Sequence, residues 1–416
     1  MQKSYNLQSC TLIFCFLEGG ISMEKGKVWT AIIAGGQGTR LFPLSHDECP
    51  KQFCHLNKTQ TFIQATIKRF VDFGVKPRRV VIIVTNDNQL NLAKEQCVPL
   101  GIISENILKI DPNYGYAGAM IKAAEFINEL DEDAIIINTP ADQFIVSDES
   151  FTETINNALD SARAGNPTII GVKVSDLVTF TGCGHALFHA PENDEELPIY
   201  DVEGFVEKPD KNTALALMRE NSSACNTGIN VWDVHTILSI RVETIVGLGT
   251  DELMASLRLY ANLKVAVGTF PWHDCGTLKS LFEISAKTPN HKNATLGNGK
   301  VERTDCRGSL FYTIEGVTLR ATNIKDEAII LNVIDGKIVL AAVKLKDSQK
   351  VKQFAEKYNE HKDLLTEDFS FGARNNIIMR TDFSKELNAG FVGADSHIVY
   401  SHKNADGSIE IAVSEQ

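Results

Sequence analysis

The sequence predicts an α/β fold, in which a mostly parallel sheet carries helices on both faces and a smaller β-rich domain follows. Apolar runs of strand length alternate with helical stretches from residue 28 onward, and this order is typical of βαβ units. The predicted strands are continuously apolar, which indicates a sheet that is buried on both faces. Past residue 290 the helical stretches give way to short β-like segments, so a second domain is expected there.

The elements of the large domain follow in chain order. Strands are expected at 28–34, 80–85, 107–110, 134–138, 168–174 and 204–206, and helices at 62–70, 88–97, 117–130, 151–164 and 213–220. The acidic segment 192–198 is expected to form a hairpin tip or loop. Three glycines (Gly35, Gly36 and Gly38) follow the first strand directly, which predicts a tight turn there.

The rest of the chain divides into four predicted regions. Residues 1–27 fit the remainder poorly and are expected to be a disordered or non-native extension, and 28–290 form the large domain. Turn-punctuated apolar segments predict a β-helix-like region at 291–345. Residues 346–416 are expected to hold a helix at 348–365 and a C-terminal hairpin of 397–400 with 409–413.

Composition excludes several classes of protein. The net charge of −12 argues against general nucleic-acid binding, which usually needs a basic surface. The apolar run 11–17 is too short to cross a bilayer, and no membrane partner is expected. Nine scattered cysteines without a CxxC pair argue against a disulfide framework or a structural zinc site. Reduced thiols in a cytoplasmic protein are therefore expected, with Cys49, Cys183 and Cys275 packing as small residues.

The residues after the first strand point to phosphate chemistry. Backbone amides of a glycine turn can point at phosphate oxygens. Arg40 offers a planar fork of donors that suits a triphosphate, and Lys51 adds a point charge. The spacing matches neither the dinucleotide-binding GxGxxG motif nor the P-loop, so neither assignment applies.

The whole string from Gly35 to Ser45, followed by Pro50-Lys51-Gln52-Phe53, resembles the N-terminal signature of the sugar nucleotidylyltransferases. Its ending is most similar to the mannose-1-phosphate guanylyltransferase branch, and the resemblance extends from Val28 to Ala342. It implies that residues 28–290 are the catalytic domain. It also implies that Arg40 and Lys51 bind and activate the triphosphate, with Gly35, Gly36, Gly38 and Thr39 completing the nucleotide site.

Two aspartates are candidate metal ligands. Asp142 follows a buried strand within Asn138-Thr139-Pro140-Ala141-Asp142-Gln143, at the sheet edge where ligands gather. It matches the family's Mg²⁺-binding aspartate, although position alone equally allows a cap on the next helix. Trp272-His273-Asp274-Cys275-Gly276 resembles the family's W-x-D-x-G, which makes Asp274 the second ligand. Magnesium prefers such oxygen ligands, and the pairing of the two residues is implied by the resemblance.

Three further segments resemble the family's sugar-phosphate site. Phe205 to Pro209 resembles FVEKP, in which Glu207 would bind sugar hydroxyls and Lys208 the phosphate. A proline after Lys208 predicts extended backbone at that lysine. Thr181 to Gly184 resembles TGYG and places Gly182 along the sugar. Asn226 to Ile229 resembles NSGI and assigns Asn226 to the sugar.

The chain departs from the guanylyltransferase pattern at several positions. Gly115-Tyr116-Ala117 stands where an Arg-Asn-Thr element lies beside the nucleobase, and Cys183 replaces the tyrosine of TGYG. Phe42 and His46 replace the usual Trp and Arg. Tyr116 is a candidate to stack on the base, or it packs against its helix. The C-terminal histidines are isolated, so a second isomerase activity is not expected.

The resemblance implies nucleotidylyl transfer from a nucleoside triphosphate to a sugar 1-phosphate, with Mg²⁺ as cofactor and pyrophosphate as product. GTP and mannose 1-phosphate are the expected substrates. Another base, or heptose or glucose 1-phosphate, is the alternative within this chemistry. A regulatory paralogue that binds nucleotide sugars and a β-rich assembly module are alternatives outside it. A homo-oligomer such as a dimer is also expected.

Overall fold

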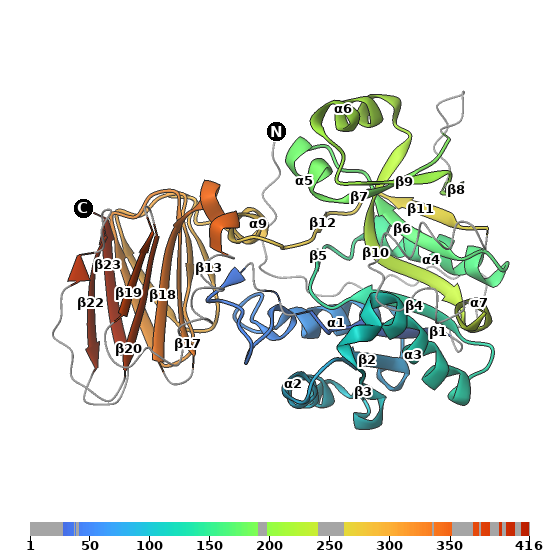
Figure 1. The fold of residues 1–416 in the computed structure, drawn as a ribbon, viewed down its shortest axis with the longest axis horizontal. Helices are drawn as coiled ribbons and strands as arrows, with labels where there is room; N and C mark the ends of the chain where they lie inside the picture. The colour runs from blue at the N-terminus through green and yellow to red at the C-terminus, as the bar shows by residue number, and fades with distance from the viewer. Residues whose placement is uncertain are drawn as a thin grey trace, which may run out of the picture. The chain divides into compact units, whose positions relative to one another are not determined.

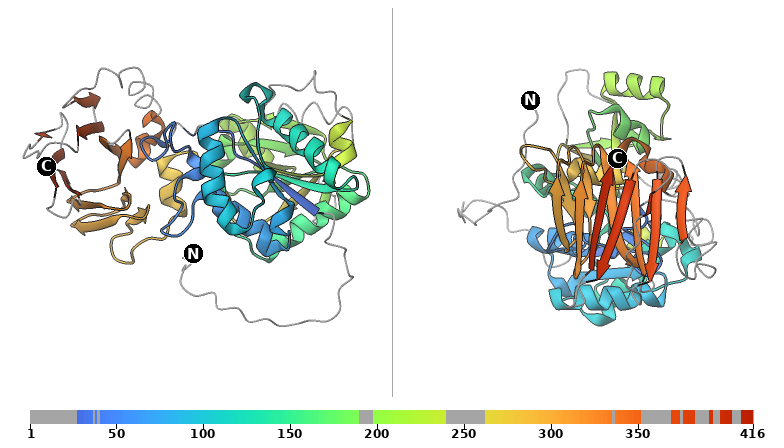
Figure 2. Two further views of the ribbon diagram at one scale, coloured as in Figure 1. Left: turned by 90° about the horizontal axis from the view of Figure 1, so that it is seen from below. Right: turned by 90° about the vertical axis from the view of Figure 1, so that its left-hand side faces the viewer.

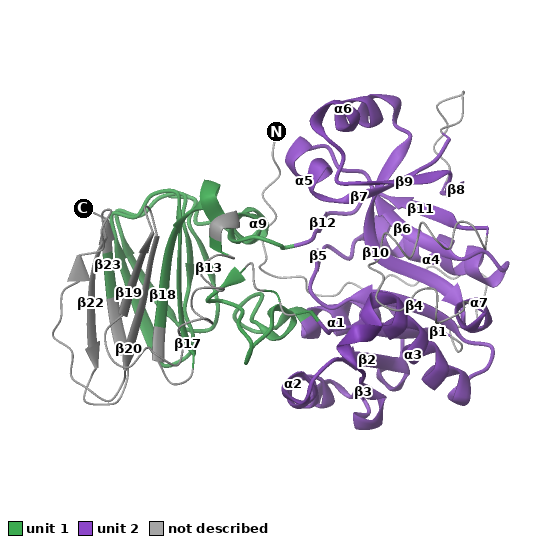
Figure 3. Ribbon diagram, viewed as in Figure 1, with its two compact units in different colours: residues 1–22, 36–62, 275–416 green, residues 23–35, 63–274 purple. Residues whose placement is uncertain are grey.

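A computed structural model describes residues 28–36, 38, 41–189, 198–239, 262–334, 337–351, 369–373, 376–382, 391–392, 397–403 and 409–415. The described chain forms two compact units (Figure 3). Those residues of 23–35 and 63–274 make up the α/β unit, and those of 36–62 and 275–416 make up the β unit. The predicted N-terminal extension and the acidic loop 192–197 lie outside the described residues.

The α/β unit is built on one large sheet (Figure 1). Its strands run in the order β3-β2-β1-β4-β10-β6-β11-β8, with β7 beside β10 and β9 beside β7. Their bounds are β1 Val28–Ile33, β2 Val80–Val84, β3 Ile107–Lys109, β4 Ile135–Pro140, β6 Thr168–Val172, β7 Gly184–Leu187, β8 Ile199–Asp201, β9 Gly204–Glu207, β10 Ser223–Asp233 and β11 Lys264–Gly268. The pairs among β1 to β4 are parallel, and β10 joins both β4 and β6 in antiparallel fashion.

Helices cover both faces of this sheet (Figures 1 and 2). They are α1 Phe62–Phe73, α2 Asp87–Cys97, α3 Gly115–Leu130, α4 Glu149–Arg163, α5 Leu177–Gly182, α6 Lys211–Glu220 and α7 Val234–Leu238. The side chains of β2 are buried on both faces, as its unbroken apolar run predicts. A core of α3, α7 and the sheet forms around Trp232, which is fully buried. The predicted fold class is confirmed, with strand and helix ends shifted by a few residues.

The β unit contains two sheets. One runs in the order β13-β15-β17-β18-β20-β19 and the other in the order β14-β16-β23-β22-β21. The bounds are β13 Ala294–Leu296, β14 Lys300–Thr304, β15 Leu310–Tyr312, β16 Val317–Thr322, β17 Glu327–Ile334, β18 Lys337–Lys344, β19 Phe369–Ala373, β20 Asn376–Asp382, β21 Phe391–Val392, β22 His397–Lys403 and β23 Ile409–Glu415. The chain visits the two sheets alternately from β13 to β17, and its strands pair in parallel within each sheet, as in a β-helix.

The C-terminal part continues both sheets with antiparallel strands. The predicted hairpin is present as β22 and β23, and β23 adds to β16 in parallel. Of the predicted helix at 348–365, the described residues show the end of a 3-10 helix, Leu345–Lys350, and one further helical residue, Val351; residues 352–365 lie outside them. The division of the chain at residues 290 and 345 stays a prediction. No helix in the described ranges is long and apolar enough to cross a membrane.

The segment after the first strand is anchored within the β unit by Asn332. Its side chain, on β17 and 5% exposed, donates to the carbonyl oxygens of Pro43 (2.8 Å) and Leu44 (3.3 Å). Both acceptors belong to the string that carries the signature. A buried amide with two carbonyl partners fixes the path of that string.

Replacing Asn332 with alanine should lower the free energy of unfolding by about 1–3 kcal/mol, because two buried carbonyl groups lose a donor. Chemical denaturation followed by circular dichroism would measure the change. The exposed Asn212→Ala on α6 is the matched control and should stay within about 0.5 kcal/mol of the parent. Equal stability of the two variants would contradict this anchoring role.

Candidate active site

The carboxyl edge of the sheet carries the first two predicted segments. In the parallel pair of β1 and β4, Ile33 lies opposite Pro140, so Gly35 and Asp142 each follow that position by two residues. The Ala141 amide donates to the Ile33 carbonyl (3.1 Å) and extends this contact. The Thr85 hydroxyl donates to the Gly35 carbonyl (3.3 Å). Ligands of open α/β sheets bind at this edge.

A short ladder brings the two predicted metal ligands to the same place. β5 (Phe144–Ile145) and β12 (Trp272–His273) pair in antiparallel fashion, with Trp272 opposite Ile145 and His273 opposite Phe144. Continuing this register places Asp274 opposite Gln143, next to Asp142. Two aspartates that are far apart in the sequence therefore lie near one end of a two-stranded ladder, and their joint role as metal ligands stays a prediction.

The donor set at this ladder fits a magnesium ion. Two carboxylates supply the hard oxygen ligands that Mg²⁺ takes in proteins, and substrate phosphates usually complete its shell. Asp142 is half-buried, and the side chain of Asp274 is 52% exposed with His273 Nδ1 3.4 Å from its Oδ1. The following helix α4 is capped by Asp148, whose carboxylate accepts from the Phe151 amide. Capping that helix is therefore not the role of Asp142.

Lys51 lies in the β unit together with Gly36 and Gly38. It begins a 3-10 helix, Lys51–Phe53, is 5% exposed, and places its ammonium 5.4 Å from the centroid of the Phe62 ring. Gly38 has a φ of +67°, and a Cβ there would lie 2.5 Å from the Lys51 Cβ. Only glycine combines this backbone conformation with so close an approach.

The same turn is held by side chains of the signature. The Gln52 amide donates to the Gly36 carbonyl (2.9 Å), and the Ser45 hydroxyl donates to the Gly38 carbonyl. Thr39 and Arg40 lie outside the described residues, so their predicted phosphate contacts stay predictions.

β10 carries Asn226 at an irregular point of the sheet. The register of β10 against β6 shifts between Asn226 and Asn230, and Gly228 has a φ of +75°. Such bulges re-aim side chains and often lie beside active sites. The Asn226 carbonyl oxygen of the side chain accepts from the Gly228 amide (3.0 Å).

Buried polar contacts join this bulge to the Asp142 segment. The Gln143 side chain donates to the Thr227 carbonyl, and the Asn138 side chain donates to that of Asn230 (3.1 Å). The Thr227 hydroxyl donates to the Ile170 carbonyl on β6 (2.8 Å). Gln143, Thr227 and Asn230 were not predicted as site residues, because the sequence gives no signal for contacts across strands. The one available indication was that Gln143 and Thr227 lie within the NTPADQ-like and NSGI-like strings and that Asn230 directly follows the second.

Tyr116 supports the same bulge from α3. Its hydroxyl donates to the Gly228 carbonyl (2.7 Å), and its ring packs against the core of the α/β unit. Burial raises the pKa of this phenol above its usual range, so it stays a neutral donor. The packing alternative therefore describes Tyr116 in this structure, and stacking on a nucleobase stays a prediction.

The sugar-phosphate candidates lie around β7 and β9, with Gly182 at the exposed end of α5. Glu207 ends β9 opposite Gly184, and its carboxylate forms an ion pair with the exposed Lys208. The prediction of extended backbone at Lys208 is wrong, since its φ is +44°. The chain must turn there because β9 ends at Glu207, and the Lys208 amide donates to the Cys183 carbonyl (3.2 Å) in the turn.

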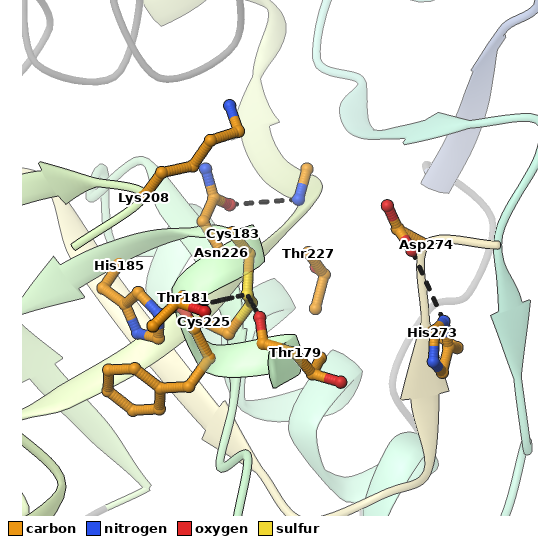
Figure 4. The surroundings of a disulfide bond; sticks show 12 residues. Thr179, Thr181, Cys183, His185, Lys208, Cys225, Asn226, Thr227, His273 and Asp274 are labelled. Carbon is orange, nitrogen blue, oxygen red and sulfur yellow. Dashed lines mark hydrogen bonds and ion pairs between the residues drawn. A yellow bond between two sulfur atoms is a disulfide. The ribbon is translucent and has the colours of Figure 1, made fainter. Parts of the chain in front are cut away.

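Cys183 and Cys225 form a disulfide bond (Figure 4). The expectations that the thiols are reduced and that Cys183 only packs are therefore wrong for this pair. The antiparallel pairing of β7 with β10 puts His185 opposite Cys225, which brings Cys183 within bonding reach. Asn226 directly follows Cys225, and the Lys208 amide forms its hydrogen bond with the Cys183 carbonyl. The disulfide therefore links the two segments that carry the predicted sugar-phosphate residues Asn226 and Lys208. Among the other described cysteines, Cys49 and Cys275 take no part in a disulfide.

His185 lies beside the disulfide and is fully buried. Its ring stacks on Phe180, and its Nε2 lies 2.8 Å from the Phe180 carbonyl oxygen. Burial lowers the pKa of His185, against smaller opposing effects of that carbonyl and of Glu207. Cys183, His185 and Cys225 are close enough to hold a metal ion, but both sulfurs are already used in the disulfide.

A mixed, mostly parallel sheet with a glycine turn after its first strand, and with two aspartates near its carboxyl edge, is the arrangement expected of a nucleotide-binding transferase of the α/β class. The sequence matches the family described as nucleotidyl transferase over residues 30–291. The chain belongs to this family, and it is an enzyme of the sugar-1-phosphate nucleotidyltransferase type, as the resemblance implied.

Individual relatives are similar at a lower level. A mannose-1-phosphate guanylyltransferase of Escherichia coli is 26% identical over 321 residues, which are 69% of this chain and 67% of that protein. One of Salmonella montevideo is 28% identical over 364 residues, 80% of this chain and 75% of that protein. A crystal structure from Thermus thermophilus, described as a mannose-1-phosphate geranyltransferase, superposes with a TM-score of 0.64 at 24% identity, and covers 80% of this chain and 99% of its own. That likeness confirms the fold.

Breaking the disulfide should destabilise the α/β unit. The bond closes a loop between residues 42 positions apart, and loops of this length contribute roughly 2–4 kcal/mol. We expect dithiothreitol to lower the Tm of the parent protein in scanning fluorimetry. Cys183→Ser should have a similarly lowered Tm, and this Tm should be the same with and without the reductant.

Thiol counting under denaturing, non-reducing conditions provides the control. The parent has nine cysteines and should expose seven thiols, whereas Cys183→Ser should expose eight because Cys225 is released. The matched variant Cys97→Ser, at a buried free cysteine, should expose six. Nine thiols in the parent would show that the bond does not form in solution.

Proposed function

We propose that this enzyme transfers the guanylyl group of GTP to mannose 1-phosphate, with Mg²⁺ as cofactor, and releases pyrophosphate. The observation that supports the proposal is the β5–β12 ladder, because Asp142 precedes β5 and Asp274 follows β12, at the same end of that antiparallel pair. The PKQF string and the names of the relatives from Escherichia coli and Salmonella support the choice of guanosine and mannose.

The reaction needs no protein nucleophile. A phosphate oxygen of the sugar phosphate forms a bond to the α-phosphorus of the triphosphate, and the bond from that phosphorus to the β-phosphate oxygen breaks. Asp142 and Asp274 would hold Mg²⁺, which when bound neutralises charge on the phosphates. Arg40 and Lys51 would stabilise the charge that develops at the α-phosphorus. Positioning and electrostatics supply the acceleration in such transfers.

The sugar phosphate would be held by residues around the disulfide. Lys208 has an exposed ammonium on a left-handed turn beside Cys183, and Lys ammonium groups are common phosphate partners. Asn226 lies at the bulge of β10, and Glu207 and Gly182 lie on the neighbouring segments. These four residues are the ones that we propose bind the mannose 1-phosphate.

Removing either carboxylate should strongly impair catalysis. We expect Asp142→Asn and Asp274→Asn to lower kcat by at least about 100-fold, the usual loss when one charge-stabilising group is removed. Pyrophosphate release in saturating Mg²⁺ would measure this. The exposed Asp160→Asn on α4 is the matched control, with kcat within about twofold of the parent. Near-normal turnover of Asp142→Asn would overturn the metal assignment.

A substrate panel tests the choice of base and sugar. The four common nucleoside triphosphates would each be assayed against mannose, glucose and heptose 1-phosphates, and pyrophosphate release would be followed. We expect turnover with GTP and mannose 1-phosphate alone. Turnover with a different pair would reassign the substrates and keep the reaction. Binding of nucleotide sugars without turnover across the panel would favour a regulatory paralogue.

A further inference from the structure

We propose that the β unit binds a small molecule with at least two phosphate groups in a cavity of about 850 Å³. The cavity is lined by α9 (Leu278–Ile284), by the loop after it, by the turns that precede β15 and β17, and by the residues that follow β18. None of the residues predicted for nucleotidylyl transfer lines it. The inference goes beyond the proposed function and does not depend on it.

The lining has the opposite charge balance to the chain. Seven of its side chains are Lys or Arg and two are acidic, whereas the whole sequence has 41 basic and 53 acidic residues. An ordinary solvent-exposed surface of this chain would carry more acidic than basic side chains, as the whole sequence does. This cavity instead has an excess of five positive charges. Clefts lined by one sign of charge raise the local concentration of ligands of the opposite sign.

Three of the cations lie at the same edge of one sheet, at or next to the ends of the neighbouring strands β15, β17 and β18. Arg307 pairs with Lys325 in a parallel bridge, and these residues precede β15 and β17, which are neighbours in the sheet. Lys344 ends the next strand, β18. Neighbouring strands lie about 4.8 Å apart, and like charges directly opposite each other are destabilising. A bound anion would relieve this repulsion.

The seven cations differ in whether they already have partners. Lys344 forms an ion pair with Glu327, and the Lys279 Nζ lies 3.7 Å from the Glu283 Oε1 in a second ion pair. Lys287 donates to two backbone carbonyls, at 2.9 and 3.2 Å. The structure records no ion pair with another described residue for four more: Lys292, Arg307, Lys325 and Lys346. A ligand with two or more anionic groups can bind several of these four at once.

The environment of Lys287 supports the same conclusion. Its ammonium lies 4.7 Å from the centroid of the Phe282 ring, which also lines the cavity. Burial lowers the pKa of Lys287, against the smaller opposing effect of Glu283. A partly desolvated ammonium gains more from an added anion than a solvated one does.

Phosphate is the anion that this set of donors fits. Arg307 offers a planar fork that binds a phosphate group through two hydrogen bonds, and the lysines add point charges. The volume lies within the range of about 300–1,000 Å³ of small-molecule sites. The shared chemistry has several sources, namely inorganic polyphosphate, a nucleotide or a sugar bisphosphate, and the aromatic ring of Phe282 is available to a base or sugar.

Titration calorimetry on the full chain tests the proposal, with inorganic tripolyphosphate as the probe and EDTA present to exclude magnesium. The double variant Arg307→Gln with Lys325→Gln should bind tripolyphosphate at least tenfold more weakly than the parent, and Lys346→Gln at least threefold. Lys300→Gln is the matched control: this exposed lysine of β14 pairs with Glu302 outside the cavity, and its affinity should not change. A nucleoside diphosphate and a hexose bisphosphate, titrated in parallel, distinguish the sources.

Thermal unfolding separates a ligand site from a structural role. Without anion, the double variant should unfold at or above the Tm of the parent because repulsion is relieved, and tripolyphosphate should raise the Tm of the parent more than that of the double variant, which keeps the triphosphate site of the proposed function. Equal affinity of the parent and the double variant would overturn the proposal. An equal loss in Lys300→Gln would do the same, because it would show a general effect of net charge.

Discussion

The site depends on one constraint, the insertion of the eleven-residue strand β10 between β4 and β6 in antiparallel fashion. A strand that runs against its neighbours brings its middle, and not its end, to the carboxyl edge of the parallel strands. At that edge its register shifts between Asn226 and Asn230. The backbone carbonyls freed by the bulge accept hydrogen bonds from Tyr116 and Gln143, so α3 and the Asp142 segment are both fixed by β10.

The fold could largely be predicted from local patterns. The apolar runs at β1, β2 and β4 and the helical spacing of α1 and α4 are visible within ten to fifteen residues each. Secondary structure depends on such local periodicity. Strand order depends on long-range pairing, which one sequence does not reveal. The antiparallel position of β10 and the alternation of β13 to β17 between two sheets therefore emerge only from the structure.

The site could be predicted less completely, for the same reason. Motif strings single out Asp142, Asp274 and Lys51 as candidates, but where these residues lie depends on pairings such as that of β5 with β12. Scattered cysteines argued against disulfides, and the pairing of β7 with β10 still brought Cys183 to Cys225. The rule for residues before proline failed at Lys208 because a strand end and a hydrogen bond to Cys183 outweighed a local preference.

Two departures from the guanylyltransferase pattern converge on the bulge of β10. Tyr116, from the segment that the resemblance places beside the nucleobase, donates to the Gly228 carbonyl. Cys183, from the segment that the resemblance places along the sugar, is bonded to Cys225. Asn226 lies between these two attachments. The base-side and sugar-side substitutions therefore act on one structural element, and neither is an isolated surface change. Their effects on substrate choice should accordingly be non-additive, because residues that share a partner are energetically coupled.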